Sequence, residues 1–335
     1  MKTEKIDVSN YRDLLQKYIM AQDERSLYQA EQFSKYSIQH NISPEEIINV
    51  HIQALKELYP ELPAEIDASM NFLLETMISY GLAYQEFRSL QEKQGALESE
   101  ISIAANVQQN LLSTTKPNVI GLDIGAISVP SHQMNGDYYH FVTDESNNLG
   151  IAVADVIGKG IPAALAMSMI KYSMDSFPDT MRSPSVILEH LNRVVGRNIA
   201  DSSMFITMFY GLYNDDTGAL QYSSAGHEPG FYYCAEKDTF FEMKTQGLVL
   251  GVTCQADYEQ HGITMVEGDI AIFLTDGVTE CRIGDRFIEK EEVLEVIREY
   301  MHLPAQEAVC SVYRHFERLQ DFHLRDDFTL IFLKK

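Results

Sequence analysis

Apolar residues in the first part of the chain recur at helical spacing. Residues 43–46, Ser-Pro-Glu-Glu, have the form of a capping box with proline at the first helical position. The apolar positions that follow keep helical spacing until Pro60 (Ile47, Ile48, Leu55 and Leu58). Residues 11–40 and 64–88 show the same periodicity. The pattern predicts an all-helical N-terminal domain over residues 1–84.

A second apolar pattern, with spacing of three and four residues, runs through residues 85–119. Its positions are Phe87, Leu90, Gln94, Leu97, Ile101, Ala104, Gln108 and Leu111. The spacing predicts a short coiled-coil linker that dimerises or carries a signal, and the two glutamines should weaken it. An amphipathic helix lying on its own domain is the alternative.

From residue 120 onward, short apolar runs typical of strands replace the helical pattern. They cover residues 122–129, 138–142, 150–156, 205–213, 230–233, 269–274 and 328–333. Helical periodicity returns at residues 162–177, 184–199, 290–301 and 304–319. Because the helices come in pairs between groups of strands, residues 120–335 should form two layers of mainly antiparallel sheet flanked by helices. The expected class is α+β.

Charge and cysteine spacing argue against several classes of protein. A net charge of -23 over 335 residues, with no run of Lys or Arg, argues against a nucleic-acid or anionic-membrane surface. The four cysteines have no CxxC spacing, which favours reduced thiols over disulfides or a zinc site. The N-terminal residues lack the apolar run of a signal peptide. We expect a soluble, cytoplasmic protein.

Four aspartates lie in separate turn-like contexts, each bordering an apolar strand-like run. They are Asp137 in Gly-Asp-Tyr-Tyr, Asp155 in Asp-Val-Ile-Gly-Lys-Gly, Asp276 in Thr-Asp-Gly and Asp326 in Asp-Asp-Phe-Thr. Carboxylates at strand ends beside glycines can converge on one point, and hard divalent cations take oxygen ligands. The pattern predicts a metal-dependent hydrolase.

Taken singly, these motifs have simpler interpretations. Asp155 suits a strand-terminal turn, and the glycines around Lys159 do not match a Walker A loop. Asp326 and Asp327 should repel each other unless a positive group lies between them, and either a metal or Arg325 could fill that place.

The histidines give weaker signals. His227, in Ala-Gly-His-Glu-Pro-Gly, is in a context where a histidine is more often structural than a ligand. The sequence has no HExxH motif and no GxSxG elbow, so zinc proteases and serine hydrolases have no support.

The order of six motifs resembles the bacterial PPM-type serine/threonine phosphatases of the SpoIIE/RsbU class. The matching segments are Glu100–Leu112, Gly136–Tyr139, Asp155–Gly160, Ala225–Pro229, Leu274–Glu280 and Asp326–Leu330. The N-terminal helical region also resembles that of a regulator of the general stress sigma factor in Bacillus-like bacteria. Together the resemblance covers nearly the whole chain.

This resemblance implies an αββα sandwich with two Mn²⁺ or Mg²⁺ ions between the sheets. Asp155 would bridge both ions, with the Val156 carbonyl on one of them. Asp276 and Asp326 would complete the shell of the other ion, and Asp137 would hold the first directly or through water. The ions would activate a water for in-line attack on the phosphoryl group.

Two departures from the family pattern concern the same region. His140 follows Tyr139 where family members often have aspartate, and Ile157 stands where the eukaryotic branch carries a histidine that can act as general acid. The proton donor to the serine leaving group is therefore unassigned, with water or His227 as candidates. Lys159 could contact phosphate or be solvated.

The resemblance also implies a substrate and an activator. The expected function is removal of phosphate from serine of a STAS-domain anti-anti-sigma factor, switched on when a kinase-like protein binds the N-terminal domain of a homodimer. Two alternatives are a non-catalytic dimeric adaptor with a phosphatase fold and a metal-dependent phosphodiesterase.

Overall fold

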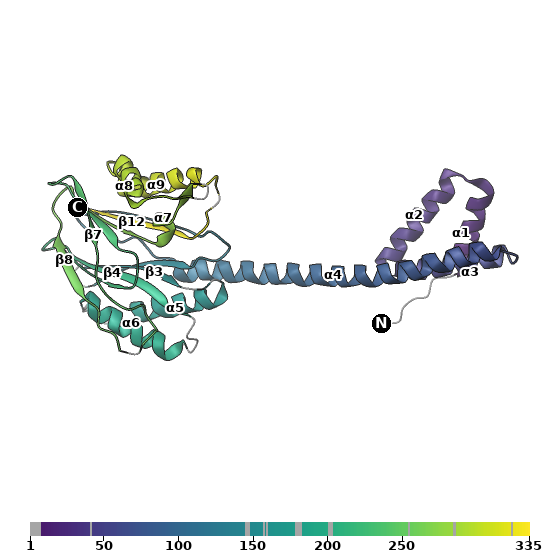
Figure 1. The fold of residues 1–335 in the computed structure, drawn as a ribbon, viewed down its shortest axis with the longest axis horizontal. Coiled ribbons are helices and arrows are strands. Elements are labelled where there is room, and N and C mark those ends of the chain that lie inside the picture. Colours follow the sequence, from purple (N-terminus) through teal and green to yellow (C-terminus); the bar gives the residue numbers. More distant parts are fainter. Residues whose placement is uncertain are drawn as a thin grey trace. The chain divides into compact units, whose positions relative to one another are not determined.

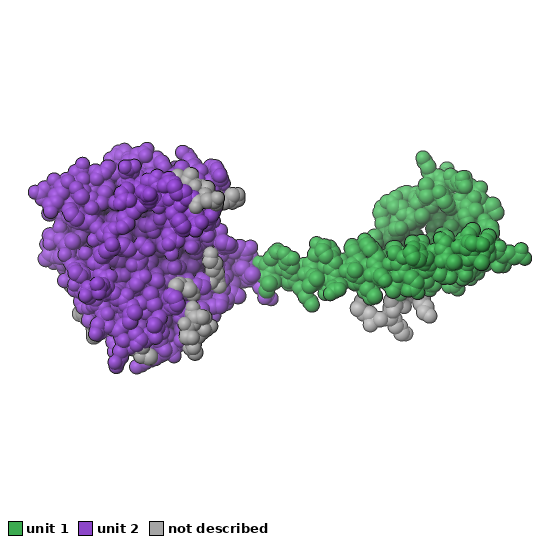
Figure 2. Space-filling view, viewed as in Figure 1, with its two compact units in different colours: residues 1–98 green, residues 99–335 purple. Residues whose placement is uncertain are grey.

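The computed structural model describes most of the chain, in two compact units. The described residues are 8–40, 42–144, 148–156, 158, 160–177, 183–199, 204–253, 255–283, 286–322 and 324–335. Unit 1 is Met1–Glu98 and unit 2 is Ser99–Lys335 (Figure 2). The domain boundaries expected near residues 84 and 119 stay predictions.

Unit 1 is helical. It contains α1 (Val8–Ala21), α2 (Glu24–Gln39), α3 (Pro44–Leu58) and the first part of α4 (Ala64–Leu112). The expected helical segment over residues 11–40 is interrupted, because Gln22 has a positive φ of 47° and Asp23 caps α2 by accepting from the Ser26 N–H. Ser43 caps α3 by accepting from the Glu46 N–H, as its capping motif predicts.

Helix α4 is continuous over 49 residues and belongs to both units. The linker positions Phe87, Leu90, Leu97 and Leu111 are all exposed along it, whereas Ile101 and Ala104 are half-buried. Gln108 was expected in the same seam, but it is buried within unit 2.

The described part of unit 2 contains two five-stranded antiparallel sheets. One has the order β1-β12-β9-β6-β7, and the other has the order β2-β3-β4-β5-β8. Their strands are β1 (Asp123–Val129), β2 (Asp137–Thr143), β3 (Leu149–Val156), β4 (Ile206–Asn214), β5 (Ala219–Ala225), β6 (Gly230–Cys234), β7 (Thr239–Met243), β8 (Gln260–Thr264), β9 (Ile270–Leu274) and β12 (Phe328–Lys334). A short hairpin, β10 (Arg282–Ile283) and β11 (Arg286–Phe287), follows the one-turn helix α7 (Asp276–Thr279).

Alternation along the strands divides the apolar residues among three buried layers. In β12, Phe332 faces the helices α8 (Lys290–Tyr300) and α9 (Ala305–Leu319), while Ile331 faces the other sheet. In β3, Val153 faces between the sheets, while Ala154 faces the helices α5 (Ile161–Asp175) and α6 (Pro184–Asn198). Figure 1 shows the two helix pairs on opposite sides of the strands. The predicted αββα sandwich is confirmed.

Besides the short hairpin β10–β11, three strands of the two five-stranded sheets lie outside the apolar runs that predicted strands. They are β5, β7 and β8, of which β7 and β8 form the edges of their sheets. Four of the five residues of β8 are exposed, and polar side chains on an edge strand discourage pairing with another chain. Among the described residues, we find no helix with the length and apolarity needed to span a membrane.

Candidate metal centre

Asp137 and Asp155 lie opposite each other on neighbouring strands. Asp137 begins β2, Asp155 is the penultimate residue of β3, and the two are paired in the antiparallel register. Their neighbours Tyr138 and Ala154 belong to the apolar layer beneath α5 and α6. Since successive side chains of a strand alternate between faces, both carboxylates point toward the other sheet.

Asp276 and Asp326 come from the corresponding end of that other sheet. Asp276 opens α7 directly after β9, and Asp326 precedes β12, which pairs with β9. A side chain at Gly277 would overlap the carbonyl oxygen of Asp327, so this glycine allows α7 to lie against the start of β12. The four aspartates predicted from sequence therefore stand at one end of the sandwich.

Thr275 connects the two sheets at this end. Its N–H donates to the Thr329 carbonyl oxygen at 3.2 Å, within the β9/β12 sheet. Its hydroxyl donates to Asp137 Oδ2 at 2.6 Å, on the β2/β3 sheet. The Asp137 carboxylate is thereby held in a fixed orientation between the sheets.

Burial and like charge make these carboxyl groups hard to ionise. Burial raises the pKa of Asp155 to about 7, and the negative charges of Asp276, Asp326 and Asp327 add to the shift. Burial, followed by the charge of Asp326, raises the pKa of Asp276 to about 6. Burial also raises the pKa of Asp137 well above its ordinary value. The charged neighbours that most affect Asp155 and Asp276 are all acidic.

Asp327 has a different role from its neighbour. Its Oδ1 accepts from the Ser131 N–H at 2.6 Å and from the Ser131 hydroxyl at 2.9 Å, and its Oδ2 accepts from the Gly136 N–H. The sequence indicated that a positive group was needed beside Asp326 and Asp327. For Asp327, neutral hydrogen-bond donors supply the compensation, and its carboxylate anchors the segment that leads into Asp137.

His227 is buried beneath the site and both of its ring nitrogens are engaged. Nε2 lies 3.1 Å from the Leu274 carbonyl oxygen, and Nδ1 lies 2.8 Å from the Thr207 hydroxyl. Because a carbonyl oxygen only accepts, Nε2 carries the proton and Nδ1 accepts from Thr207. Burial lowers the pKa of His227 to about 4. This geometry supports the structural interpretation of His227 over the catalytic one.

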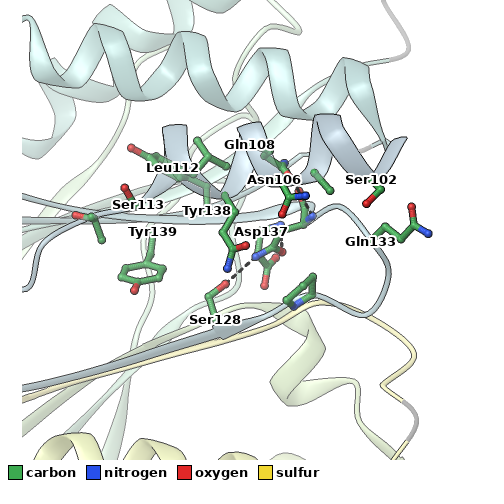
Figure 3. A pocket seen from close by; sticks show the side chains of 15 residues that line it. Ser102, Asn106, Gln108, Leu112, Ser113, Ser128, Gln133, Asp137, Tyr138 and Tyr139 are labelled. Atoms are coloured by element: carbon green, nitrogen blue, oxygen red, sulfur yellow. Dashed lines mark hydrogen bonds between the residues drawn. The ribbon is translucent and has the colours of Figure 1, made fainter. Parts of the chain in front are cut away.

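A cavity of about 560 Å³ opens beside Asp137. It lies between the C-terminal part of α4 and the segment that joins β1 to β2, and Figure 3 shows Asn106 and Gln108 on one side with Ser128 on the other. Polar side chains make up much of its lining. The carboxylate end of the sandwich is thus reachable from this side.

Comparison with known proteins identifies the family. The family model described as stage II sporulation protein E matches residues 145–335, and the model of the N-terminal domain of the phosphoserine phosphatase RsbU matches residues 9–83. Phosphoserine phosphatase RsbU of Bacillus subtilis is 54% identical over 325 residues, which cover 97% of this chain and 96% of the relative. The chain belongs to the RsbU family of phosphoserine phosphatases.

Solved structures show the same fold at low sequence identity. The SiaA PP2C domain of Pseudomonas aeruginosa aligns with a TM-score of 0.62 at 17% identity, covering 72% of this chain and 98% of that domain. A SpoIIE fragment of Bacillus subtilis containing the PP2C phosphatase domain aligns with a TM-score of 0.55 at 15% identity, covering 65% of this chain and 64% of that one. PP2C-type phosphatases depend on metal ions.

The carboxylates of this RsbU-family chain have the right chemistry for such ions. Among the described residues, no three His, Cys, Asp or Glu side chains are arranged as a ready metal-ligating group. The donor set still fits a hard divalent cation, because it consists of carboxylate oxygens whose neighbours are acidic. A cation would reverse the pKa shifts that crowding and burial impose.

The residues that depart from the family pattern lie away from the carboxylates or outside the described residues. His140 lies on the opposite face of β2 from Asp137, where its Nε2 is 2.8 Å from Asp175 Oδ1 of α5, so it does not touch the carboxylates. Ile157 and Lys159 fall outside the described residues. Val156 ends β3, and its N–H donates to the Gly136 carbonyl oxygen at 3.2 Å.

Sequence reasoning missed three residues of this region. Thr275 follows an apolar strand and gave no signal of its own, and Gln108 was assigned to the coiled-coil seam by its spacing. Asp327 was noticed only as the neighbour of Asp326. The adjacency of two acids before an apolar strand was the one available signal.

Proposed function

We propose that this phosphatase uses two Mn²⁺ or Mg²⁺ ions to dephosphorylate phosphoserine in a STAS-domain anti-anti-sigma factor, and so activates the general stress sigma factor. The observation that carries the proposal is the position of Asp137, Asp155, Asp276 and Asp326 at one end of both sheets. Membership of the RsbU family gives the reaction class.

The ligand roles follow the family motifs residue by residue. Asp155 would bind both ions, and the Val156 carbonyl oxygen would bind one of them. Asp276 and Asp326 would hold the second ion, and Asp137 would hold the first directly or through water. Two divalent cations at such a site lower the pKa of a water molecule and stabilise charge on the phosphoryl oxygens.

Ion binding should change the protonation state of the carboxyl groups. With a pKa raised to about 7, Asp155 is partly protonated near neutral pH, and Asp276, at about 6, is partly protonated somewhat below it. Ion binding therefore displaces protons, and affinity should rise with pH across this interval. Thr275 holds Oδ2 of Asp137 in a hydrogen bond.

Activation is assigned to the N-terminal region. A kinase-like protein binds unit 1, whose large exposed apolar side chains suit a protein partner. The exposed seam of α4 pairs with that of a second copy in a homodimer. Lys159 is a candidate phosphate contact. Neither nucleic acid nor a membrane is required, and the setting is the cytoplasm.

The test is phosphate release from a serine-phosphorylated STAS protein. The full chain and Asp155→Asn would be assayed with and without Mn²⁺ and with and without the kinase-like partner. We expect release that needs Mn²⁺, rises with the partner, and falls on the order of 10³-fold in Asp155→Asn, because the variant loses a carboxylate ligand and so weakens binding of the ions that activate the water and stabilise the phosphoryl charge.

Two results would contradict the proposal. Metal-independent release would exclude the two-ion mechanism, and full activity of Asp155→Asn would exclude the assigned centre. No release by wild type under any condition would favour the adaptor alternative for this substrate.

A further inference from the structure

Gln108 is a buried glutamine on a helix whose adjacent residues are exposed. It lies in the part of α4 that belongs to unit 2 and is 4% exposed, while Gln109 and Asn110 beside it face solvent. Its Nε2 donates to the Asn135 carbonyl oxygen at 2.7 Å, and its Oε1 accepts from the Asn135 N–H at 3.1 Å. One side-chain amide thus satisfies both polar groups of a single backbone residue.

Asn135 in turn makes a hydrogen bond with Asp137. Its Oδ1 accepts from the Asp137 N–H at 3.0 Å, and its Nδ2 donates to the Ser128 hydroxyl at 2.9 Å at the end of β1. Asn135 lines the cavity together with Gln108, Ser128 and Asp137, which are labelled in Figure 3. The intervening Gly136 N–H is held by Asp327. Residues 135–137 are therefore fixed by α4, β1 and the segment before β12.

We propose that Gln108 is a positioning residue that sets the orientation of the Asp137 carboxylate through the Asn135 backbone. The inference deepens the proposed function and rests on Asp137 being a metal ligand there. A side chain that lacks hydrogen-bonding groups at position 108 would leave a buried N–H and a buried C=O without these partners. The segment would then have to move to satisfy them, and Asp137 would move with it.

The contact also gives α4 a direct route to the carboxylate end of the sandwich. Any rotation or withdrawal of the last turns of α4 breaks both hydrogen bonds of Gln108 together, because they go to one residue. Residues that orient a metal ligand from behind typically contribute 10- to 100-fold to metal affinity. Gln108 should fall in that range although it lies on a helix outside the two sheets.

The test compares Gln108→Met with Gln109→Met in the full chain. Methionine keeps the length and helix propensity of glutamine but removes both hydrogen-bonding groups. Mn²⁺ binding would be measured by calorimetry, and hydrogen exchange of the amides of residues 135–137 would be followed in protein stripped of metal with EDTA. For Gln108→Met we expect 10- to 100-fold weaker Mn²⁺ binding and at least 10-fold faster exchange at the Asn135 amide. Gln109→Met should behave as wild type in both measurements.

Several outcomes separate this inference from its alternatives. Wild-type Mn²⁺ affinity and wild-type exchange in a folded Gln108→Met variant would overturn it. Equally fast exchange throughout unit 2 would show a general loss of stability in Gln108→Met. Gln108→Glu, which keeps an acceptor for the Asn135 N–H, would then be measured instead. Wild-type Mn²⁺ affinity in a folded Gln108→Glu variant would also overturn the inference. If wild type itself binds no Mn²⁺, the proposed function fails, and the exchange data alone then decide whether Gln108 fixes residues 135–137.

Discussion

The two units of this chain bury their apolar residues to very different extents. Unit 2 has three buried apolar layers, one between its sheets and one beneath each helix pair. In the described part of unit 1 the buried apolar side chains are few (Ile42, Val50, Ile52 and Ala54), whereas Met20, Ile38 and Phe72 are at least 70% exposed. A monomeric surface of that kind is typical of a binding region. Unit 2 therefore holds its own fold, whereas unit 1 has an exposed apolar surface.

The largest effect that would test this contrast comes from two phenylalanines. Phe332 of β12 is fully buried and Phe72 of α4 is 75% exposed. Phe332→Ala should lower the free energy of unfolding by about 3–5 kcal/mol, because it leaves a cavity in a packed layer. Phe72→Ala should change it by less than about 0.5 kcal/mol. Urea unfolding of the two variants and the wild type in the same buffer measures both changes in the free energy of unfolding.

The same pair should behave in the opposite way toward a partner. Phe72→Ala should weaken binding of the kinase-like protein or of a second copy, and a folded Phe332→Ala should not. A large loss of stability in Phe72→Ala would show that its exposed surface is covered within the chain, and the contrast between the units would be lost.

A smaller effect concerns pH, where the units should respond with opposite signs. The folded-state pKa of Asp155, about 7, lies above that of an ordinary aspartate, so its contribution favours folding at low pH and is lost as pH rises through 7. Burial lowers the pKa of His51 in α3, so its contribution is lost as pH falls through the ordinary range of histidine. The buried His140 and His227 of unit 2 have lowered pKa values and act with the same sign as His51, but the three carboxyl groups of the site with raised pKa values outweigh them. Without metal, unit 2 should therefore lose stability and unit 1 should gain it between about pH 5.5 and 7.5.

Calorimetry of the EDTA-treated chain across this interval would measure the change, with Asp155→Asn as the matched variant. The variant should remove much of the pH dependence of unit 2 and leave that of unit 1 unchanged. A metal-free unit 2 that becomes more stable as pH rises would contradict the assigned crowding of carboxylates. Mn²⁺ should reverse the trend in unit 2, because it binds the ionised groups.

The aspartates could be found from sequence because they lie at the ends of apolar strands. Side-chain contacts between residues far apart in the sequence could not be predicted. Asp155 and Asp276 follow runs such as Ile270–Leu274 that read as strands on composition alone, and the strand pairing then brings their ends together. The hydrogen bond from Thr275 to Asp137 spans 138 residues of sequence, and no local pattern encodes it.

In the linker, the sequence predicted the helix but not the contacts of its side chains. Periodicity correctly placed Gln108 on a helix, but periodicity describes a helix face and not what that face contacts. The seam spacing grouped Gln108 with Leu97 and Leu111, which are exposed, although its amide is directed into unit 2 at Asn135. The strands β7 and β8 were missed for a related reason, since polar edge strands have little apolar pattern to detect.

The smallest expected effect tests whether the exposed seam of α4 pairs with a second copy. Gln94 is exposed and its Nε2 donates to Glu98 Oε1 at 2.8 Å, so Gln94→Leu should change monomer stability by less than about 0.5 kcal/mol. In a paired seam the two new leucines, one from each copy, would together bury apolar surface worth about 1–2 kcal/mol, which tightens the dimer about tenfold. Gln85→Leu, on the opposite side of the same helix, is the matched control, and sedimentation equilibrium measures both. An equal gain in the two variants would indicate nonspecific association, because only a seam distinguishes position 94 from position 85.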